Sequence, residues 1–469
     1  MSTSLSTSLS TSPSSATANR RQWLGRSAAA LALAAAPALP AWAAAGPVSL
    51  PPLPLRERRL ANGLQLVALP MAEAGTVSVQ VWYRVGGKDD PPGRSGFAHL
   101  FEHMMFKRSR HMPDEMFDRL TEDVGGQNNA FTAEDMTAYQ NEVPANHLER
   151  LLWAEAERMA HLQVDQANFD SERKVVIEEL RQRVLADPYG RLFNALAPNT
   201  YEAHPYRRPV IGSEADLNAA TLDDVRRFHA TYYRPDNALL IVAGGFDPGQ
   251  LDAWVDRYFG PLQRPDGAIP RVAVTEPPRS RDARVALTAP NVPLPAVALL
   301  WKGPAAAHAD APALQIAQAL LSAGDSSRLN EALVYRAQSA QAAGFAAELN
   351  ADAGMLVAYA IAASGQPLAK LEAALLQQIQ RLAEQPIAPA ELAKVRTQLV
   401  TQALLGRQTP QGQAGAIGQA VLLLGEARAA ERTLARLQAV SAADVQRALK
   451  THVLGRRRVT LEYTQGAAS

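Results

Sequence analysis

The sequence predicts an α+β protein built from two duplicated units, each a mostly antiparallel sheet packed with helices. Three observations predict this class. The chain has 469 residues, of which 47% are hydrophobic and 20% charged, a composition typical of a globular protein large enough for several domains. Strand-like runs alternate with helical patterns, and their order at 77–106 recurs at 295–322. A stretch rich in Pro, Arg and Asp at 263–283 indicates a linker between the halves.

The N-terminal segment is typical of an export signal. Paired arginines at 20–21 precede an apolar run at 27–39 and small residues at 41–45, which are the three parts of a signal peptide. The arginine pair resembles the twin-arginine signal, which carries folded proteins across a bacterial inner membrane, so we expect a periplasmic protein. Cleavage after Ala43 or Ala45 fits this pattern. An anchor helix is the alternative, but the run contains prolines and is shorter than the roughly 18–20 apolar residues that span a bilayer.

Charge and cysteine content exclude several classes of function. Lys and Arg number 47 against 46 Asp and Glu, and loss of the signal with its three arginines would change the net charge from +1 to −2. A nearly neutral chain gives no electrostatic reason to expect nucleic acid or anionic lipid as a partner. Cysteine is absent, so any metal must be held by His and carboxylates.

The two units contain comparable elements. In the first, apolar runs predict strands at 64–69, 77–83 and 237–244, and helical spacing predicts helices at 95–106, 114–124, 145–161, 167–186 and 248–259. In the second, the same patterns predict a strand at 296–301 and helices at 311–322, 367–384 and 389–405. We therefore expect a signal peptide at 1–45, a first α+β domain at 46–262, a linker at 263–283 and a second α+β domain at 284–469. No segment after the signal is expected to span a membrane.

His99, Glu102 and His103 form the motif His-x-x-Glu-His. On a helix, imidazoles four residues apart lie on one face, close enough to bind one metal ion. Zinc accepts imidazole and carboxylate, and a catalytic zinc usually has three protein ligands and one water. Glu102 adjoins the same face and could act as a general base on that water. The motif is one of the known zinc-peptidase patterns, whereas the alternative is a surface helix with incidental histidines.

A third ligand is expected from the helix at 167–186, where Glu172, Glu178 and Glu179 are candidates. Glu172 and Glu179 are seven residues apart and lie on one face, whereas Glu178 is rotated by about 100° from Glu179. If this face addresses the metal, Glu179 can bind it and Glu172 can support the site. The alternative is that all three are solvated carboxylates.

Five motifs in order make the chain similar to the pitrilysin/insulinase family of zinc peptidases, and most similar to bacterial relatives of the mitochondrial processing peptidase. They are GFAHLFEHMMFK, GGQNNAFTAEDMTAY, AERM at 156–159, HPYRRPVIG and YYRPDNALLIVAG. The resemblance covers essentially the whole mature chain, more strongly up to residue 245. It implies a processing-peptidase-like fold.

The resemblance also implies roles for individual residues. In the family, the two motif histidines and a glutamate some 76 residues further on bind zinc, which corresponds to His99, His103 and Glu179 and to one Zn²⁺ per chain. The family pattern places the catalytic base at Glu102. Its supporting glutamate, seven residues before the ligand, corresponds to Glu172 in the catalytic centre.

The substrate groove is expected along the segment from Gly125 to Val143. Its small residues and its β-prone alternation suit an open sheet edge that an extended peptide could join as an added strand. The resemblance implies that Asn129 and Ala130 meet the substrate backbone beside the zinc. An ordinary hairpin edge is the alternative.

The second unit departs from the family pattern. Family members that act alone carry an Arg and, seven residues later, a Tyr in this half, whereas the matching positions here are Val334 and Gln341. Tyr335 and Arg336 could fill the role after a small shift in register. The segment at 313–321, which matches the first motif, has no His or acid, so we expect a metal-free second domain. The resemblance therefore suggests a heterodimer with a related subunit that supplies the pair, with a homodimer as the alternative.

Two functions of different class follow. The first is a zinc-dependent endopeptidase that hydrolyses extended or unfolded peptides with a zinc-held water activated by Glu102. The second is a non-catalytic structural or binding subunit that retains the peptidase fold. The presence of all four site residues, Glu102 and the three predicted ligands, favours the enzyme. His204 is expected in a packed turn, and six histidines without partners at ligand spacing are expected on the surface or in the core: His111, His147, His161, His229, His308 and His452.

Overall fold

The computed structural model describes residues 48–466. The predicted signal peptide at 1–45 and its cleavage site lie outside the described residues. Within the described part of the chain, no helix is both long and apolar enough to cross a membrane.

The first sheet has six strands in the order β1-β2-β6-β3-β5-β4. β2 and β6 are parallel, and the other neighbouring strands are antiparallel. Because β4 pairs only with β5, it forms one edge of the sheet. The strands are β1 (Arg56–Arg59), β2 (Gln65–Pro70), β3 (Thr76–Tyr83), β4 (Gln127–Thr132), β5 (Thr137–Pro144) and β6 (Ala238–Gly244).

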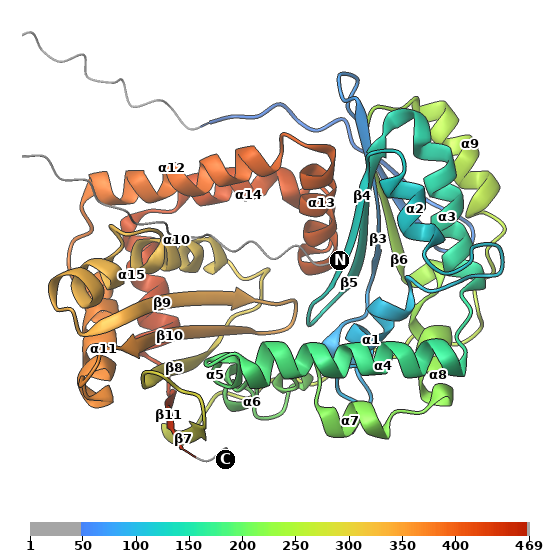
Figure 1. Cartoon of the computed structure of the whole chain (residues 1–469). Coiled ribbons are helices and arrows are strands. Elements are labelled where there is room, and N and C mark those ends of the chain that lie inside the picture. Colours follow the sequence, from blue (N-terminus) through green and yellow to red (C-terminus); the bar gives the residue numbers. More distant parts are fainter. Residues whose placement is uncertain (1–47, 467–469) are drawn as a thin grey trace, which may run out of the picture. The chain divides into compact units, whose positions relative to one another are not determined.

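Helices cover one face of this sheet (Figure 1). The inward side chains of β3, such as Val79 and Val81, pack with Phe101 of one helix and Leu151 of another in a single apolar core. Alternate residues of a strand point to opposite faces, which is why every second residue of β3 belongs to this core. The longer helices of this half are α1 (Phe97–Met104), α2 (Met116–Glu122), α3 (Leu148–His161), α4 (Gln166–Leu180), α8 (Leu222–Tyr232) and α9 (Pro248–Tyr258).

A helix from the second half of the chain covers the opposite face of the first sheet. In α13 (Pro410–Leu424), Ile417 and Val421 pack against Trp82 of β3 and Ile241 of β6. Gly418 allows this approach, because a Cβ atom there would lie 2.3 Å from the Trp82 ring. The two halves of the sequence therefore interleave, and the domain boundaries expected from the sequence stay a prediction.

The second sheet repeats the topology of the first. Its order is β7-β11-β8-β10-β9, with β7 and β11 parallel and the other neighbouring pairs antiparallel, which corresponds strand for strand to β2-β6-β3-β5-β4. The strands are β7 (Ala283–Ala289), β8 (Ala296–Gly303), β9 (Ala340–Leu349), β10 (Gly354–Ala362) and β11 (Val459–Gln465). The predicted class of two duplicated α+β units is thus confirmed.

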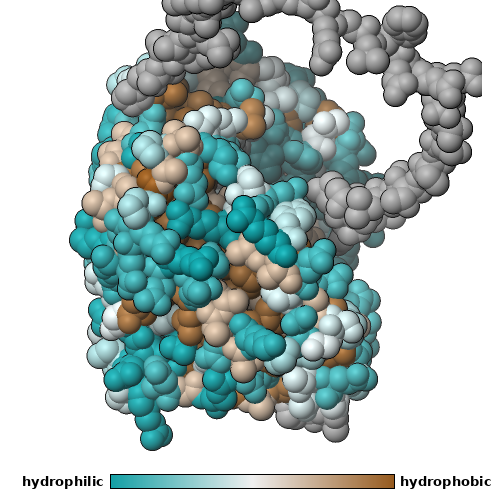
Figure 2. Space-filling view, turned by 90° about the vertical axis from the view of Figure 1, so that its left-hand side faces the viewer, coloured by the Kyte–Doolittle hydropathy of each residue, from teal (hydrophilic) through white to brown (hydrophobic). Residues whose placement is uncertain are grey.

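Helices also cover one face of the second sheet. The helices α10 (Ala311–Ser322) and α11 (Leu368–Glu384) contact its strands, and α12 (Pro389–Gly406), α14 (Ala429–Ala439) and α15 (Ala442–Leu449) pack against these helices. Two short helices from the first half, α5 (Gly190–Asn194) and α6 (Leu196–Thr200), contribute Leu192 and Leu196 to the core on the other face of this sheet. Figure 2 shows that hydrophilic residues predominate on the left-hand face of Figure 1, with hydrophobic residues scattered among them. That mixture is ordinary for a solvent-exposed surface.

Candidate metal and catalytic centre

The motif histidines lie on α1, and the N-terminus of this helix is held by a buried carboxylate. Asp90 accepts hydrogen bonds from the backbone N–H groups of Gly96 (2.7 Å) and Ala98 (2.9 Å). These N–H groups have no partner within the helix, so the carboxylate satisfies them where the helix dipole favours negative charge. These hydrogen bonds fix the first turn of α1, which begins at Phe97, two residues before His99.

His99 and His103 lie one turn apart on α1, as the spacing predicts. Their ring centroids are 5.0 Å apart and the rings are perpendicular. His99 is buried, and its Nδ1 has no hydrogen-bond partner within the described chain.

Glu179 completes a group of three ligand-type side chains. It lies near the end of α4, which packs beside α1 (Figure 1). Its Oε2 is 3.5 Å from Nε2 of His99 and 3.4 Å from Nε2 of His103. Tetrahedral zinc with bonds of about 2.0–2.1 Å places neighbouring ligand atoms about 3.3–3.4 Å apart. The separations and the donor types therefore fit a zinc ion with few adjustments.

Two further contacts orient this group. Oε2 of Glu172 is 3.6 Å from Nδ1 of His103, on the side of the ring away from Glu179, and Lys107 contacts Oε1 of Glu172 at 2.7 Å. Arg183 contacts Oε1 of Glu179 at 2.7 Å, which leaves Oε2 for the histidines. Such outer contacts fix the rotation of an imidazole or carboxylate ligand.

Glu102 lies beside the group but outside it. Its side chain is half-buried, and Thr132 of β4 donates a hydrogen bond of 2.5 Å to its Oε2. The Glu102 side chain therefore extends from α1, the helix of the two histidines, to the edge strand β4. No sequence pattern indicates a role for Thr132, Lys107 or Arg183, because Thr132 and Lys107 meet their partners through tertiary packing and Arg183 forms an ordinary i,i+4 pair.

The charges of the centre are strongly coupled. Burial, helped by the nearby His103, lowers the pKa of His99 to about 4. Burial also disfavours a charged His103, but contacts with Glu172 and Glu179 outweigh it and raise the His103 pKa to about 9. The pKa of Glu179 is lowered, first by His103, whereas burial raises that of Glu102. The carboxylates thus favour a positive charge between them, which a proton or a metal cation can supply.

The predicted substrate positions lie on the edge strand. Asn129 and Ala130 are in β4, opposite Gln140 and Tyr139 of β5. Asn129 Oδ1 accepts the backbone N–H of Ala130 at 2.9 Å, so an added strand that used this N–H would displace a local hydrogen bond. The hydrogen bond from Thr132 brings the edge strand next to Glu102.

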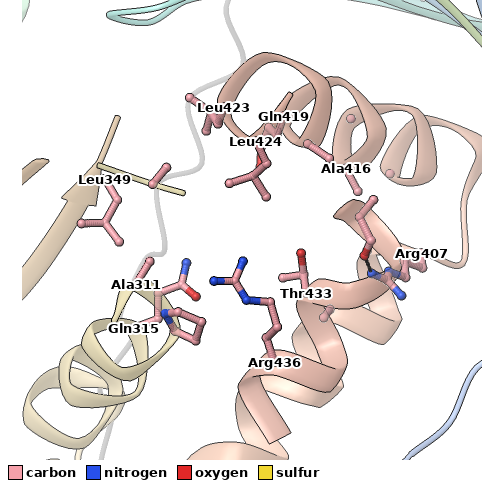
Figure 3. Close-up of a pocket in the computed structure, with 18 of the residues that line it drawn as sticks. Ala311, Gln315, Leu349, Arg407, Ala416, Gln419, Leu423, Leu424, Thr433 and Arg436 are labelled. Carbon is pink, nitrogen blue, oxygen red and sulfur yellow. Dashed lines mark hydrogen bonds between the residues drawn. The ribbon is translucent and has the colours of Figure 1, made fainter. Parts of the chain in front are cut away.

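A separate pocket lies on the opposite face of the first sheet, between α10, α12, α13 and α14. Figure 3 shows Arg436 and Gln315 pointing into it, with Leu349 and Leu424 on its wall. None of the predicted site residues in the described chain lines this pocket. It is therefore distinct from the group on α1 and α4.

Comparison with known proteins gives two matching family models. The model described as "Insulinase (Peptidase family M16)" matches residues 66–214, and the model described as "Peptidase M16 inactive domain" matches residues 219–399. The first match contains all the residues of the group on α1 and α4.

Relatives and solved structures agree with these matches. "Zinc protease PqqE" of Helicobacter pylori is 33% identical over 343 residues, covering 72% of this chain and 76% of that protein. "Probable mitochondrial-processing peptidase subunit beta" of Arabidopsis thaliana is 23% identical over 406 residues, covering 85% of this chain and 76% of that protein. The crystal structure of a protease from Helicobacter pylori has a TM-score of 0.85 and 27% identity, covering 88% of this chain and 100% of that one.

Proposed function

This chain belongs to the insulinase (M16) family of peptidases, and from that premise we propose that it is a zinc-dependent endopeptidase acting on extended or unfolded polypeptides. The observation that carries the proposal is the convergence of His99, His103 and Glu179, with Glu102 beside them. Related zinc proteases support the use of zinc, and the separations of the donor atoms suit it.

The three convergent side chains would hold the metal. A bound zinc ion supplies Lewis acidity, which polarises a scissile carbonyl and makes water more acidic. Glu179 contributes one carboxylate oxygen while Arg183 holds the other. Glu172 keeps the His103 ring turned so that Nε2 faces the same point.

Glu102 would take the proton from the attacking water. Burial raises its pKa, which makes the carboxylate a stronger base than an exposed glutamate. The Thr132 hydroxyl fixes one of its oxygens and leaves the other free to accept the proton. The same proton can then pass to the leaving amine, so Glu102 would serve as base and then as acid.

The edge strand would bind the substrate. A peptide added alongside β4 would pair through its backbone near Asn129 and Ala130, which gives affinity with little selection by side chain. This geometry favours extended chains over folded ones, because a folded protein has few free strand edges to offer.

We also infer export and pairing. The signal-like segment with its twin arginines supports a periplasmic location. The absence of the family's Arg and Tyr at Val334 and Gln341 supports a heterodimer with a related subunit. The alternative of a non-catalytic subunit is less well supported, because His99, His103 and Glu179 lie together, with Glu102 on the same helix as the histidines.

Hydrolysis of an unfolded polypeptide tests this proposal. The purified mature protein, alone and co-expressed with any related subunit, should cleave it, lose activity with a zinc chelator and regain it with added zinc. His103→Ala should neither bind zinc at this site nor cleave, since two remaining ligands hold zinc poorly. The matched control is His147→Ala, which removes a histidine outside the proposed site and should leave zinc binding and cleavage unchanged. Cleavage that survives both the chelator and His103→Ala would overturn the proposal.

A further inference from the structure

A second group of two histidines and one carboxylate lies in the second unit. His308 and Asp310 are in the turn between β8 and α10, and His452 is in the short helix Lys450–Leu454 after α15. One ligand-type atom of each residue lies within 4.8 Å of the other two. Asp310 and His452 are buried and His308 is exposed, so solvent reaches the group from one side.

The contacts of Asp310 direct one oxygen at the two imidazoles. Its Oδ2 is 3.0 Å from Nε2 of His452 and 4.0 Å from Nδ1 of His308. Its Oδ1 accepts a hydrogen bond of 2.6 Å from Nη2 of Arg447. The carboxylate is therefore held by Arg447 on one side and hydrogen-bonded to His452 on the other, and a metal bound between Asp310 and His452 would replace that hydrogen bond.

A similar arrangement occurs in the candidate zinc centre of the first unit, where the facing oxygen is 3.5 Å and 3.4 Å from two Nε2 atoms. There Arg183 contacts one oxygen of Glu179, and the other oxygen faces the two motif imidazoles. The ring pairs also agree, with centroids 5.0 Å apart at 90° in the first group and 5.1 Å apart at 89° in the second. Donor types, ring geometry and the supporting arginine are thus repeated in a part of the molecule remote in sequence from the motif.

We propose that His308, Asp310 and His452 form a second site for a divalent transition metal. Two imidazoles and one carboxylate are a donor set that suits zinc and leaves positions for water. This proposal does not depend on the proposed peptide hydrolysis. A metal site here would contradict the expectation of a metal-free second domain, which rested only on the segment at 313–321.

This site should bind more weakly than the first. Nδ1 of His308 accepts the backbone N–H of Asp310 at 3.0 Å, and a metal bound to that nitrogen would replace this hydrogen bond. Arg447 already balances part of the Asp310 charge. A bound ion would link the turn before α10 to the helix after α15, segments more than 140 residues apart in sequence, and so stabilise the second unit.

Zinc titration of a protein without the first site tests the proposal. In the full mature chain, His99→Ala with His103→Ala removes the first site, and calorimetric titration with zinc chloride should still show about one ion per chain. Adding His308→Ala should abolish this uptake, and so should His452→Ala. Adding His147→Ala, which changes a histidine outside the group, should leave it intact.

The thermal midpoint gives a second measurement. Zinc should raise the midpoint of the double variant but not that of the variant that also carries His308→Ala. Because His308 is exposed, we expect its replacement to leave the fold intact. His308→Ala alone should leave peptide hydrolysis unchanged, so failure here is distinguishable from failure of the proposed peptidase. Lack of zinc uptake by the double variant, or uptake that survives both His308→Ala and His452→Ala, would overturn the second site.

Discussion

Glu179 uses its two carboxylate oxygens differently. One oxygen faces the imidazoles of His99 and His103, and the other is held by Arg183, whose side chain is otherwise 70% exposed. The contact with Arg183 is worth little as a surface ion pair. Its significance is geometric, because it selects the rotation of the carboxylate that presents a single oxygen to the histidines.

Replacement of Arg183 should therefore weaken zinc binding. Arg183→Met should lower zinc affinity by about 10- to 100-fold, the usual effect of losing an outer contact to a ligand. Arg183→Lys should retain part of the zinc affinity, because a lysine can still reach the Glu179 carboxylate. Competition with a chromophoric chelator measures the affinity, and Lys174→Met, an exposed change on the same helix, serves as the control. Equal affinities for all four proteins would show that Arg183 does not position Glu179.

At the residue scale, local spacing predicts only part of the site. Helical periodicity places His99 and His103 together because they are four residues apart. Helical periodicity alone does not decide which glutamate of the helix at 167–186 is the third metal ligand. The family resemblance identifies Glu179 as that ligand. The contact of Thr132 with Glu102 and the approach of His308 to His452 are set by tertiary packing, which no local pattern shows.

The helix that carries the motif begins at a buried acid. Burial raises the pKa of Asp90 to about 7, although hydrogen bonds from Ala98 and Gly96 act against this. An aspartate in an unfolded chain titrates near 4, so the folded protein binds this proton more tightly. The contribution of Asp90 to stability is therefore largest below about pH 4 and decreases as the pH rises towards about 7.

Asp90→Asn should flatten this pH dependence. The amide does not titrate, so the free energy of unfolding of the variant should fall less than that of the wild type between about pH 4 and 7. Denaturant titrations of both proteins across this range measure the difference. Asp89, whose pKa burial also raises, is present in both proteins and cancels in the comparison. Parallel curves would contradict the assignment.

The contact of α13 with the first sheet can be tested at one glycine. Gly418→Ala would place a methyl group 2.3 Å from the Trp82 ring, so it should destabilise the protein by about 1–3 kcal/mol, as overpacking does. Gly415→Ala, on the same helix with open space around it, should be neutral or stabilising by up to about 1 kcal/mol. Thermal and denaturant unfolding compare the two variants. A Gly418→Ala variant as stable as Gly415→Ala would contradict this packing.

At the scale of elements, helices and strands with a clear apolar pattern are predicted from the sequence, whereas a strand built of small residues is not. The run at 77–83 corresponds to β3, and the pattern at 311–322 to α10. The segment of β9, AQAAGFAAEL, has no apolar run typical of a strand, because half of its residues are Ala, which has little preference for strands. The helix expected at 167–186 is α only to Leu180 and continues as a π-helix over Arg181–Ala186, a distinction that composition does not show.

The duplication extends to the order of strands in the two sheets. The corresponding strands β2-β6-β3-β5-β4 and β7-β11-β8-β10-β9 are built in the same chain order, each with one parallel pair. The faint repeat in the sequence predicts two units, whereas the exchange of α13 and α5 between the sheets was not predictable, because it depends on contacts between distant segments.

A partner subunit is the prediction that belongs to the whole molecule. Tyr335 is exposed, and Arg336 pairs with Glu331 at the surface. If a related subunit supplies the missing Arg and Tyr, the co-expressed pair should hydrolyse an unfolded polypeptide at least about 100-fold faster than the isolated chain, since losing one oxyanion donor costs about that factor. An isolated chain as fast as the pair, slowed by Tyr335→Phe or Arg336→Ala, would contradict the heterodimer.

The separation of metal binding from proton transfer tests the central claim most directly. Glu102→Gln should keep one zinc in the first site, because Glu102 lies outside the ligand group, yet hydrolysis should fall by about 10²–10⁴-fold, since an amide cannot accept the proton. The measurement is zinc content and peptide turnover on the same preparation, in the active assembly, with Glu178→Gln on α4 as the control. Turnover close to that of the control with zinc retained would contradict the assignment of Glu102 as the base.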